Sequence, residues 1–353
     1  MRVSNTAAAA AAAFLLGAAR AQPPFPPAGA GAWVYDVSGG QPAMWSDDIA
    51  AFNLLPGRRA HNVSTVFSYG GDMEYYEGTP NPFQTYFPAE NQAAALAYAR
   101  TAGVDYVVLV IDGRMDGGES YSPDLSKLTP SQVEQWADVT ADLYCSFESV
   151  DGIQLDLEPY AAPYAAHFLV FLARLAADLR SPERNCVSPE HPGGRSISTF
   201  MFAEAVTGEV WSALGPNGYL TVSGYDLSSA PAGVPDPPAA YAARLDSALA
   251  FVAASARAFN GSFMVGIPAA ASAHEFETYT FENGTVVNGA PQVEYATAAL
   301  SSLAKIAGAP GYLGPALWGF ASEMAFPPHS HNVFEPSNPF VAEGEEALLA
   351  RSL

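Results

Sequence analysis

The chain has 353 residues, 49% of them hydrophobic, which is enough to bury the core of two average domains or of one large α/β barrel. Its formal net charge is −21 at pH 7, with 15 Lys and Arg against 36 Asp and Glu. A surface this acidic repels phosphate groups, so we expect neither nucleic acid nor a membrane as a partner. We expect a monomer that acts on neutral or cationic material.

The N-terminus has the pattern of a secretory signal. Arg2 precedes an Ala-rich apolar run that ends in "ARA" before Gln22, which predicts a signal peptide over residues 1–21 and an extracellular protein. A low-complexity Ala tail is the alternative interpretation. Residues 22–30 form a Pro-rich leader, and residues 31–353 then form a single domain. No later apolar run is long enough to span a bilayer.

From the leader onward, short β-like runs alternate with Ala- and Leu-rich helical stretches. In chain order, the predicted elements are strand 32–37, helix 45–55, strand 62–70, helix 89–102, strand 104–112, helix 129–145, strand 151–158, helix 164–180, strand 196–205, a short helix to about 214, strand 218–227, helix 239–259, strand 262–269, helix 293–308, strand 315–321 and helix 341–353. We expect a long loop after the second strand and another around Asn283. Strict alternation of eight strands with eight helices predicts an all-parallel sheet closed into a (β/α)8 TIM barrel. A doubly wound open sheet is the rival fold, but no Gly-rich phosphate loop follows the first strand.

Cys145 and Cys186 are the only cysteines, and in an exported chain they predict one disulfide rather than a metal site or a nucleophile. Three N-x-S/T triplets, at Asn62, Asn260 and Asn283, are glycosylation acceptors if the host glycosylates and their loops are exposed. Chance also produces such triplets often.

The fourth predicted strand, "DGIQLDLE", carries unusual polar residues. Side chains alternate along a strand, so Ile153, Leu155 and Leu157 share one side and are expected to face the helices of a barrel. Gln154, Asp156 and Glu158 then face the barrel axis in successive layers. Glu158 is the last of these, at the carboxyl end, where active sites of this fold lie.

Asp156 and Glu158 are suited to acid chemistry. Their Cα atoms are expected about 6 to 7 Å apart on one face, and neighbouring carboxylates oppose each other's ionisation, which raises one pKa. A carboxyl group with a raised pKa can act as a general acid near neutral pH, as glycoside cleavage requires. We choose Glu158, at the rim, as this acid. A buried ion pair or hydrogen-bond network without chemistry is the alternative.

The strand resembles the signature of glycoside hydrolase family 18, the chitinase-type barrels, which has the form Asp-x-x-Asp-x-Asp-x-Glu. Asp151, Asp156 and Glu158 match its first, third and last acidic positions. "SGYDL" on the sixth strand resembles the Tyr-Asp motif of that family and contributes Tyr225 and Asp226. "ALWGF" on the eighth strand resembles the strand ending in the Trp that floors the sugar site.

The resemblance implies substrate-assisted retaining hydrolysis, an exception to the usual two-carboxylate scheme. Glu158 would protonate the leaving oxygen, and the substrate's own acetamido oxygen would attack the anomeric carbon. Asp156 would hold the acetamido N–H, Tyr225 would hydrogen-bond the acetamido oxygen, and Trp318 would lie under the sugar.

Gln154 departs from the signature because it replaces the middle Asp. An amide cannot relay a proton, although it can donate a hydrogen bond to Asp156, and it removes one negative charge from the site. The departure allows a related barrel that uses a second carboxylate from elsewhere. Asp112, Glu204 and Asp226 are the candidates, and each could instead be a helix cap or a salt-bridge partner.

Other motifs carry less weight. His329 and His331 form an "HSH" pair without a nearby Asp or Cys cluster, which indicates an exposed loop rather than a metal site. We expect no metal and no cofactor. Aromatic residues near strand ends either stack on sugars or pack in the core. These are Trp33, Tyr35, Tyr69, Tyr225 and Trp318.

The leading hypothesis is a secreted glycoside hydrolase acting on β-linked N-acetylglucosamine glycans, with an oligo- or polysaccharide as its substrate. We group Gln154, Tyr225, Asp226, Trp318, Asp112 and Glu204 as substrate-binding residues. One alternative is a carbohydrate-binding barrel without turnover, and another is a hydrolase of a different glycan on the same fold.

Overall fold

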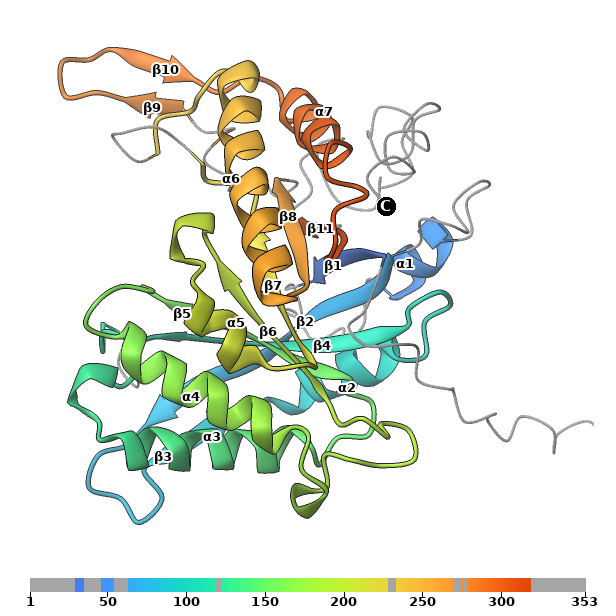
Figure 1. The fold of residues 1–353 in the computed structure, drawn as a ribbon, viewed down its shortest axis with the longest axis vertical. Coiled ribbons are helices and arrows are strands. Elements are labelled where there is room, and N and C mark those ends of the chain that lie inside the picture. The colour runs from blue at the N-terminus through green and yellow to red at the C-terminus, as the bar shows by residue number, and fades with distance from the viewer. Residues whose placement is uncertain are drawn as a thin grey trace, which may run out of the picture.

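The fold is described by a computed structural model covering residues 29–34, 46–53, 63–118, 122–227, 233–268, 275 and 278–318. Eight parallel strands close into a barrel, because β1 pairs with both β2 and β11 (Figure 1). Around the barrel the strands are β1 (Ala30–Val34), β2 (Val63–Tyr75), β4 (Tyr106–Arg114), β5 (Gly152–Glu158), β6 (Ser196–Met201), β7 (Gly218–Ser223), β8 (Phe263–Pro268) and β11 (Tyr312–Trp318). The closed parallel order confirms the predicted (β/α)8 barrel and excludes an open doubly wound sheet.

A helix follows each of the first seven barrel strands and packs outside the barrel (Figure 1). They are α1 (Ser46–Asn53), α2 (Ala89–Tyr98), α3 (Pro130–Tyr144), α4 (Ala165–Asp178), α5 (Gly208–Leu214), α6 (Pro238–Phe259) and α7 (Gln292–Leu303). The eighth predicted helix, 341–353, the signal peptide and most of the leader lie outside the described residues. Within the described ranges, no helix is long and apolar enough to cross a membrane.

Local sequence accounts for these elements. α3 begins with Pro130 after a capping box, in which the Thr129 hydroxyl accepts from the Gln132 N–H and the Gln132 side chain accepts from the Thr129 N–H. The β4 residues from Tyr106 to Ile111 are all buried, as a parallel strand covered on both faces should be.

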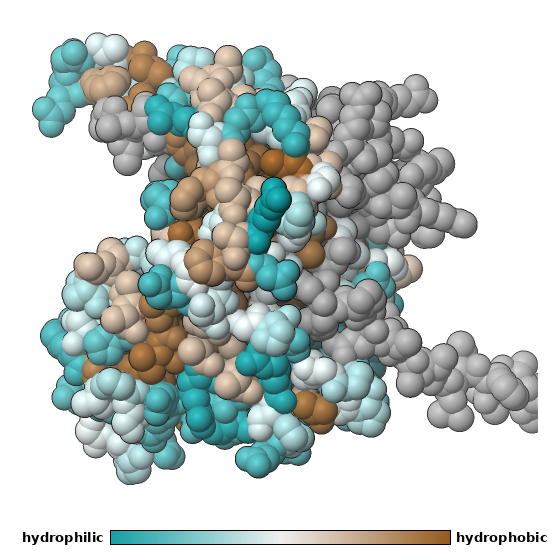
Figure 2. Space-filling model, in the orientation of Figure 1, coloured by the Kyte–Doolittle hydropathy of each residue, from teal (hydrophilic) through white to brown (hydrophobic). Residues whose placement is uncertain are grey.

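The core has two layers. The larger one lies between the strands and the helices and includes Ile153, Leu155 and Leu157. The smaller one fills the barrel, where Trp33 stacks on Phe67 with ring centroids 4.8 Å apart. On the outer surface, apolar side chains gather between α4 and α5, as Figure 2 shows.

Two predicted loops contain strands. β2 continues to Tyr75 and pairs with the antiparallel β3 (Phe83–Tyr86), within the predicted loop after the second strand. The loop around Asn283 is a hairpin of β9 (Thr278–Thr280) and β10 (Val286–Asn288). The added strands β3, β9 and β10 do not belong to the barrel cycle, so strand counting by alternation did not require them.

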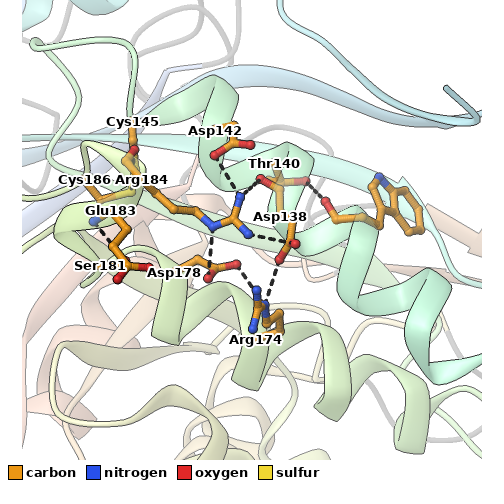
Figure 3. Close-up of polar contacts among 11 residues, drawn as sticks. Asp138, Thr140, Asp142, Cys145, Arg174, Asp178, Ser181, Glu183, Arg184 and Cys186 are labelled. Carbon is orange, nitrogen blue, oxygen red and sulfur yellow. Dashed lines mark hydrogen bonds and ion pairs between the residues drawn. A yellow bond between two sulfur atoms is a disulfide. The ribbon is translucent and has the colours of Figure 1, made fainter.

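A disulfide and an ionic cluster fix the segment after α4. Cys145 and Cys186 are bonded, with their Cα atoms 4.7 Å apart, as expected. Next to this bridge, Arg184 contacts Asp138, Asp142 and Asp178 at 2.7, 2.9 and 3.2 Å (Figure 3). The short helix η3 (Pro182–Arg184) is therefore held to both α3 and α4.

Candidate functional site

The alternation expected along β5 is present. Ile153, Leu155 and Leu157 pack in the outer core, while Gln154 is fully buried inside the barrel. The Gln154 amide contacts the side chains of Trp33, Ser198 and Thr221, which come from β1, β6 and β7. Asp156 and Glu158 have the same parity as Gln154 and therefore belong to the two layers above it, toward the carboxyl end.

Three acidic residues meet at this end of β4 and β5. Asp112 is the register partner of Asp156, and Glu158 is the register partner of Arg114. Asp156 is partly buried, whereas Asp112 and Glu158 are exposed. Burial raises the pKa of Asp156 to about 8, and the charges of Asp112 and Glu158 add to the rise. Asp156 therefore keeps its proton at neutral pH.

The neighbouring strand β2 extends this acidic row. Asp72 is the register partner of Asp112 and accepts a hydrogen bond from the Tyr69 hydroxyl. Burial, followed by the hydrogen bond to Asp72, raises the pKa of Tyr69, so the phenol stays protonated as a donor. Sequence reasoning missed Asp72, because a bulge between Tyr69 and Gly71 shifts the inward-facing parity along β2.

Arg114, at this end of β4, forms an ion pair with Asp116. Arg114 donates to both oxygens of Asp116, from Nε at 3.0 Å and from Nη2 at 2.6 Å. Among the described residues, no group of three His, Cys, Asp or Glu side chains is arranged to hold a metal ion.

Aromatic side chains form a stack at the carboxyl ends of β7 and β11. Tyr225, which follows β7, lies parallel to Trp318 at the end of β11, with ring centroids 4.4 Å apart and an interplanar angle of 11°. Phe200 stacks on Tyr225 at 5.7 Å. The structure thus brings the two predicted aromatic residues together, and Tyr225 covers one face of the Trp318 indole.

Asp226 and Glu204 lie at a different pocket from the carboxylates of β4 and β5. They line a cavity of about 540 Å³ together with Phe202 and residues of α6. Asp226 has a φ of 56°, and the buried carboxylate of Glu275 accepts hydrogen bonds from the N–H groups of Asp226 and Leu227 at 3.0 and 2.9 Å. No local sequence pattern indicates Glu275, which lies 49 residues from Asp226.

Asp151, the first acidic position of the motif, lies at the opposite end of β5. Its carboxylate accepts a hydrogen bond from the Val107 N–H at 2.8 Å, and its other oxygen is 2.9 Å from His191 Nε2. The buried Arg195 is 2.6 Å from the same His191 nitrogen. Asp151 therefore braces the amino end of the barrel.

Two of the predicted glycosylation acceptors are among the described residues. Asn260 and Asn283 are exposed, as glycosylation acceptors must be. Asn62, Tyr35, His329 and His331 lie outside the described residues.

Comparison with solved structures agrees with the barrel fold described above. No family model and no curated protein sequence matches the chain. Among solved structures, human YKL-39, described as a pseudo-chitinase with retained chitooligosaccharide binding properties, superposes with a TM-score of 0.54 at 9% identity, covering 92% of this chain and 99% of that one.

Two further structures are similar to a comparable extent. The family 18 chitinase ChiB of Flavobacterium johnsoniae has a TM-score of 0.52 at 12% identity, with coverage of 92% of this chain and 94% of the other. The chitinase-like agglutinin of Robinia pseudoacacia has a TM-score of 0.52 at 14% identity, with coverage of 92% and 99%. Likeness at such low identity establishes fold: this chain has the (β/α)8 barrel shared by glycoside hydrolase family 18 chitinases and chitinase-like proteins.

Proposed function

We propose that the protein is a chitinase-like glycoside hydrolase that cleaves β-linked N-acetylglucosamine glycans, with Glu158 as the proton donor. The observation that carries the proposal is the position of Asp156 and Glu158 on the inward face of β5, at the carboxyl end of a chitinase-type barrel. The exposed Glu158 carboxyl is accessible to a glycosidic oxygen, while the partly buried Asp156 is the better group to hold a bound acetamide.

In this mechanism Glu158 gives its proton to the leaving oxygen while the substrate's acetamido oxygen attacks the anomeric carbon. Asp156 holds the acetamido N–H, and Tyr225 donates to the acetamido oxygen. Water then opens the resulting ring intermediate and returns a proton to Glu158. Any sugar that stacks on Trp318 uses the indole face opposite Tyr225.

The proposal extends to where the protein works. The N-terminal signal pattern and the Cys145–Cys186 disulfide support an exported protein, because disulfides persist in oxidising compartments. An exposed Asn260 and an exposed Asn283 are compatible with glycosylation during export. We propose a monomer with an oligo- or polysaccharide substrate.

The first test compares the wild type with Glu158→Gln on tetra-N-acetylchitotetraose. Removal of the proton donor should lower kcat by about 10²- to 10⁴-fold, because general acid catalysis contributes that much. Binding, measured by calorimetry, should change little. Glu134→Gln, an exposed substitution on α3, is the matched control and should cleave like the wild type. Equal cleavage by wild type and Glu158→Gln would disprove the assigned role.

A second substrate separates mechanisms. Fully deacetylated oligomers lack the acetamido oxygen that attacks the anomeric carbon, so we expect them to bind without being cleaved. Cleavage at a rate similar to that of the acetylated substrate would point to a second protein carboxylate as nucleophile and to a different glycan.

The second candidate function is carbohydrate binding without turnover. It is favoured by Gln154, which replaces the middle acid of the signature and whose amide contacts Trp33, Ser198 and Thr221. Binding of the tetramer with no cleavage by the wild type would support this function over the enzyme.

A further inference from the structure

Gln154, the inward-facing residue directly below Asp156 on β5, cannot share a proton with Asp156. Gln154 Oε1 accepts a hydrogen bond from Trp33 Nε1 at 2.6 Å, and Gln154 Nε2 donates to Thr221 Oγ1 at 2.8 Å and contacts Ser198 Oγ at 3.4 Å. The side chain is fully buried and is fixed by three neighbouring strands. An amide in these contacts has no titrating group to offer.

The neighbouring strand does place an acid at the level of Asp156. Asp112 and Asp156 are register partners in the parallel β4–β5 pair, and adjacent strands lie about 4.8 Å apart. Val108 and Val110, four and two residues before Asp112, lie in the cluster that fills the barrel. The same parity points the Asp112 side chain inward, as the parity of Gln154 does for Asp156.

Other charged and titratable groups lie on the strands next to this pair. On β2, Asp72 is level with Asp112 and is hydrogen-bonded to Tyr69. On β4, Arg114 binds Asp116, and on β5, Glu158 lies one layer above Asp156. β6, on the other side of β5, contains no ionisable side chain. Burial and then the Asp112 charge are the two largest causes of the raised pKa of Asp156.

We propose that Asp112 is the proton-sharing partner of Asp156 and replaces, from the adjacent strand, the acid that is absent at position 154. This inference rests on the proposed function and makes Asp112 a positioning residue that acts through Asp156. In the resting site the two carboxyl groups share one proton and carry one negative charge.

The shared proton moves during the reaction. As the acetamido oxygen bonds to the anomeric carbon, positive charge develops on the new ring. The proton then passes from an Asp156 oxygen to an Asp112 oxygen, and the Asp156 carboxylate accepts the acetamido N–H. After water opens the ring, the proton returns to Asp156. The pair neither gains nor loses a proton, and its charge stays at −1. Asp156 is therefore negatively charged only while the new ring carries positive charge. This stabilises the transition state more than the bound substrate.

The test measures the titration of Asp156 directly, in the free protein, by ¹³C NMR of labelled aspartate carboxyl groups, with the Asp156 signal identified by its absence in Asp156→Asn. In Asp112→Asn the apparent pKa of Asp156 should fall by about one pH unit or more, because a neighbouring negative charge has been removed. Asp112→Glu keeps the charge and should preserve the high value. Thermal unfolding confirms that each variant is folded.

Asp72→Asn is the matched control, because it removes the same charge one strand farther away. It should lower the apparent pKa of Asp156 by less than Asp112→Asn does. An unchanged Asp156 titration in Asp112→Asn, or an equal fall in the two variants, would overturn the pairing.

Kinetics provide the second readout. Asp112→Asn should reduce kcat by about 10- to 100-fold with little change in KM, and should move the alkaline limb of the pH profile to lower pH by about one unit. A rise in KM alone would contradict proton sharing. If the wild type cleaves no substrate, the proposed function fails, yet the NMR titration still decides whether the two carboxyl groups are coupled.

Discussion

At the scale of single residues, a position on β5 decides what a carboxylate does. Asp151 at the amino end accepts the Val107 N–H and contacts the buried His191, so it is a structural brace. Asp156, five residues later, has a pKa raised to about 8 by burial and by nearby acids. Fully buried Gln154 between them joins three other strands. One short motif therefore contains a brace, a crosslink and a titrating group.

The raised pKa of Asp156 predicts a pH-dependent stability. An aspartate in the unfolded chain ionises near pH 4, whereas folded Asp156 holds its proton to about pH 8. Between these values the folded state binds more protons, so stability falls as pH rises. Asp156→Asn removes this contribution and should be more stable than the wild type at pH 8, by ~1–2 kcal/mol, and similar to it at pH 4. Urea unfolding at both pH values measures this difference. A constant difference across the range would contradict the raised pKa.

At the scale of elements, α3, α4 and η3 form one braced unit (Figure 3). Arg184 contacts three aspartates, and Arg174 contacts two of them, Asp138 at 2.7 Å and Asp178 at 3.2 Å. The disulfide joins Cys145, which caps the C-terminus of α3, to Cys186, two residues after Arg184. β5 and α4 both lie between the two cysteines in sequence, so the disulfide closes a covalent loop that contains the strand with the candidate acids.

Loss of Arg184 should destabilise the braced unit. In Arg184→Met, Arg174 still contacts Asp138 and Asp178, but one cation no longer balances the two carboxylates, which then repel each other. We expect a loss of ~2 kcal/mol, below the range for fully buried pairs because Arg184 is partly exposed. Asp142→Asn, on the exposed side of the cluster, is the control and should lose less than ~1 kcal/mol. Urea unfolding under oxidising conditions gives both values. Equal losses in the two variants would mean that the contacts of Arg184 with Asp138 and Asp178 stabilise the protein no more than its exposed contact with Asp142 does.

At the scale of the whole molecule, acidity dominates. Lys127 and Lys305 are the only lysines, and each lies near an aspartate, Asp124 and Asp246 respectively. The other negative charges far outnumber the arginines, giving a net charge of −21. Such a charge keeps the molecule soluble and favours approach of neutral or cationic polymers, but it also opposes compaction by self-repulsion.

Salt should therefore stabilise the protein. Raising NaCl from 10 to 300 mM shortens the screening length from about 30 Å to below 8 Å, which weakens the repulsion between surface carboxylates. We expect Tm to rise by a few degrees at pH 8, and by less at pH 5, where the net charge is smaller. Scanning calorimetry at the two salt concentrations tests this. A fall in Tm with salt would show that surface ion pairs outweigh the net charge.

Local pattern was sufficient for the alternation of strands and helices, for the closed barrel and for the two faces of β5. Side-chain periodicity depends only on neighbours in the chain, so Ile153, Leu155 and Leu157 could be assigned outward from "DGIQLDLE" alone. The Cys145–Cys186 bond followed equally simply, because the chain has no other cysteine. The two small hairpins, β2–β3 and β9–β10, were missed because they interrupt loops without changing the barrel count.

The composition of the site was decided by tertiary structure. Asp72, Asp112 and Asp156 share one layer because of register between strands that are about 40 residues apart, and the bulge in β2 adjusts that register. The side chain of Gln154 accepts a hydrogen bond from Trp33, which is 121 residues away in the sequence, whereas the local pattern suggested a hydrogen bond to Asp156. Likewise, Asp226 and Glu204 line a separate pocket, and the distant Glu275 accepts a hydrogen bond from the Asp226 N–H. The sequence alone determined which residues of β5 point inward, whereas packing between distant segments determined which inward residues meet, because register, bulges and loop placement depend on contacts that no local pattern encodes.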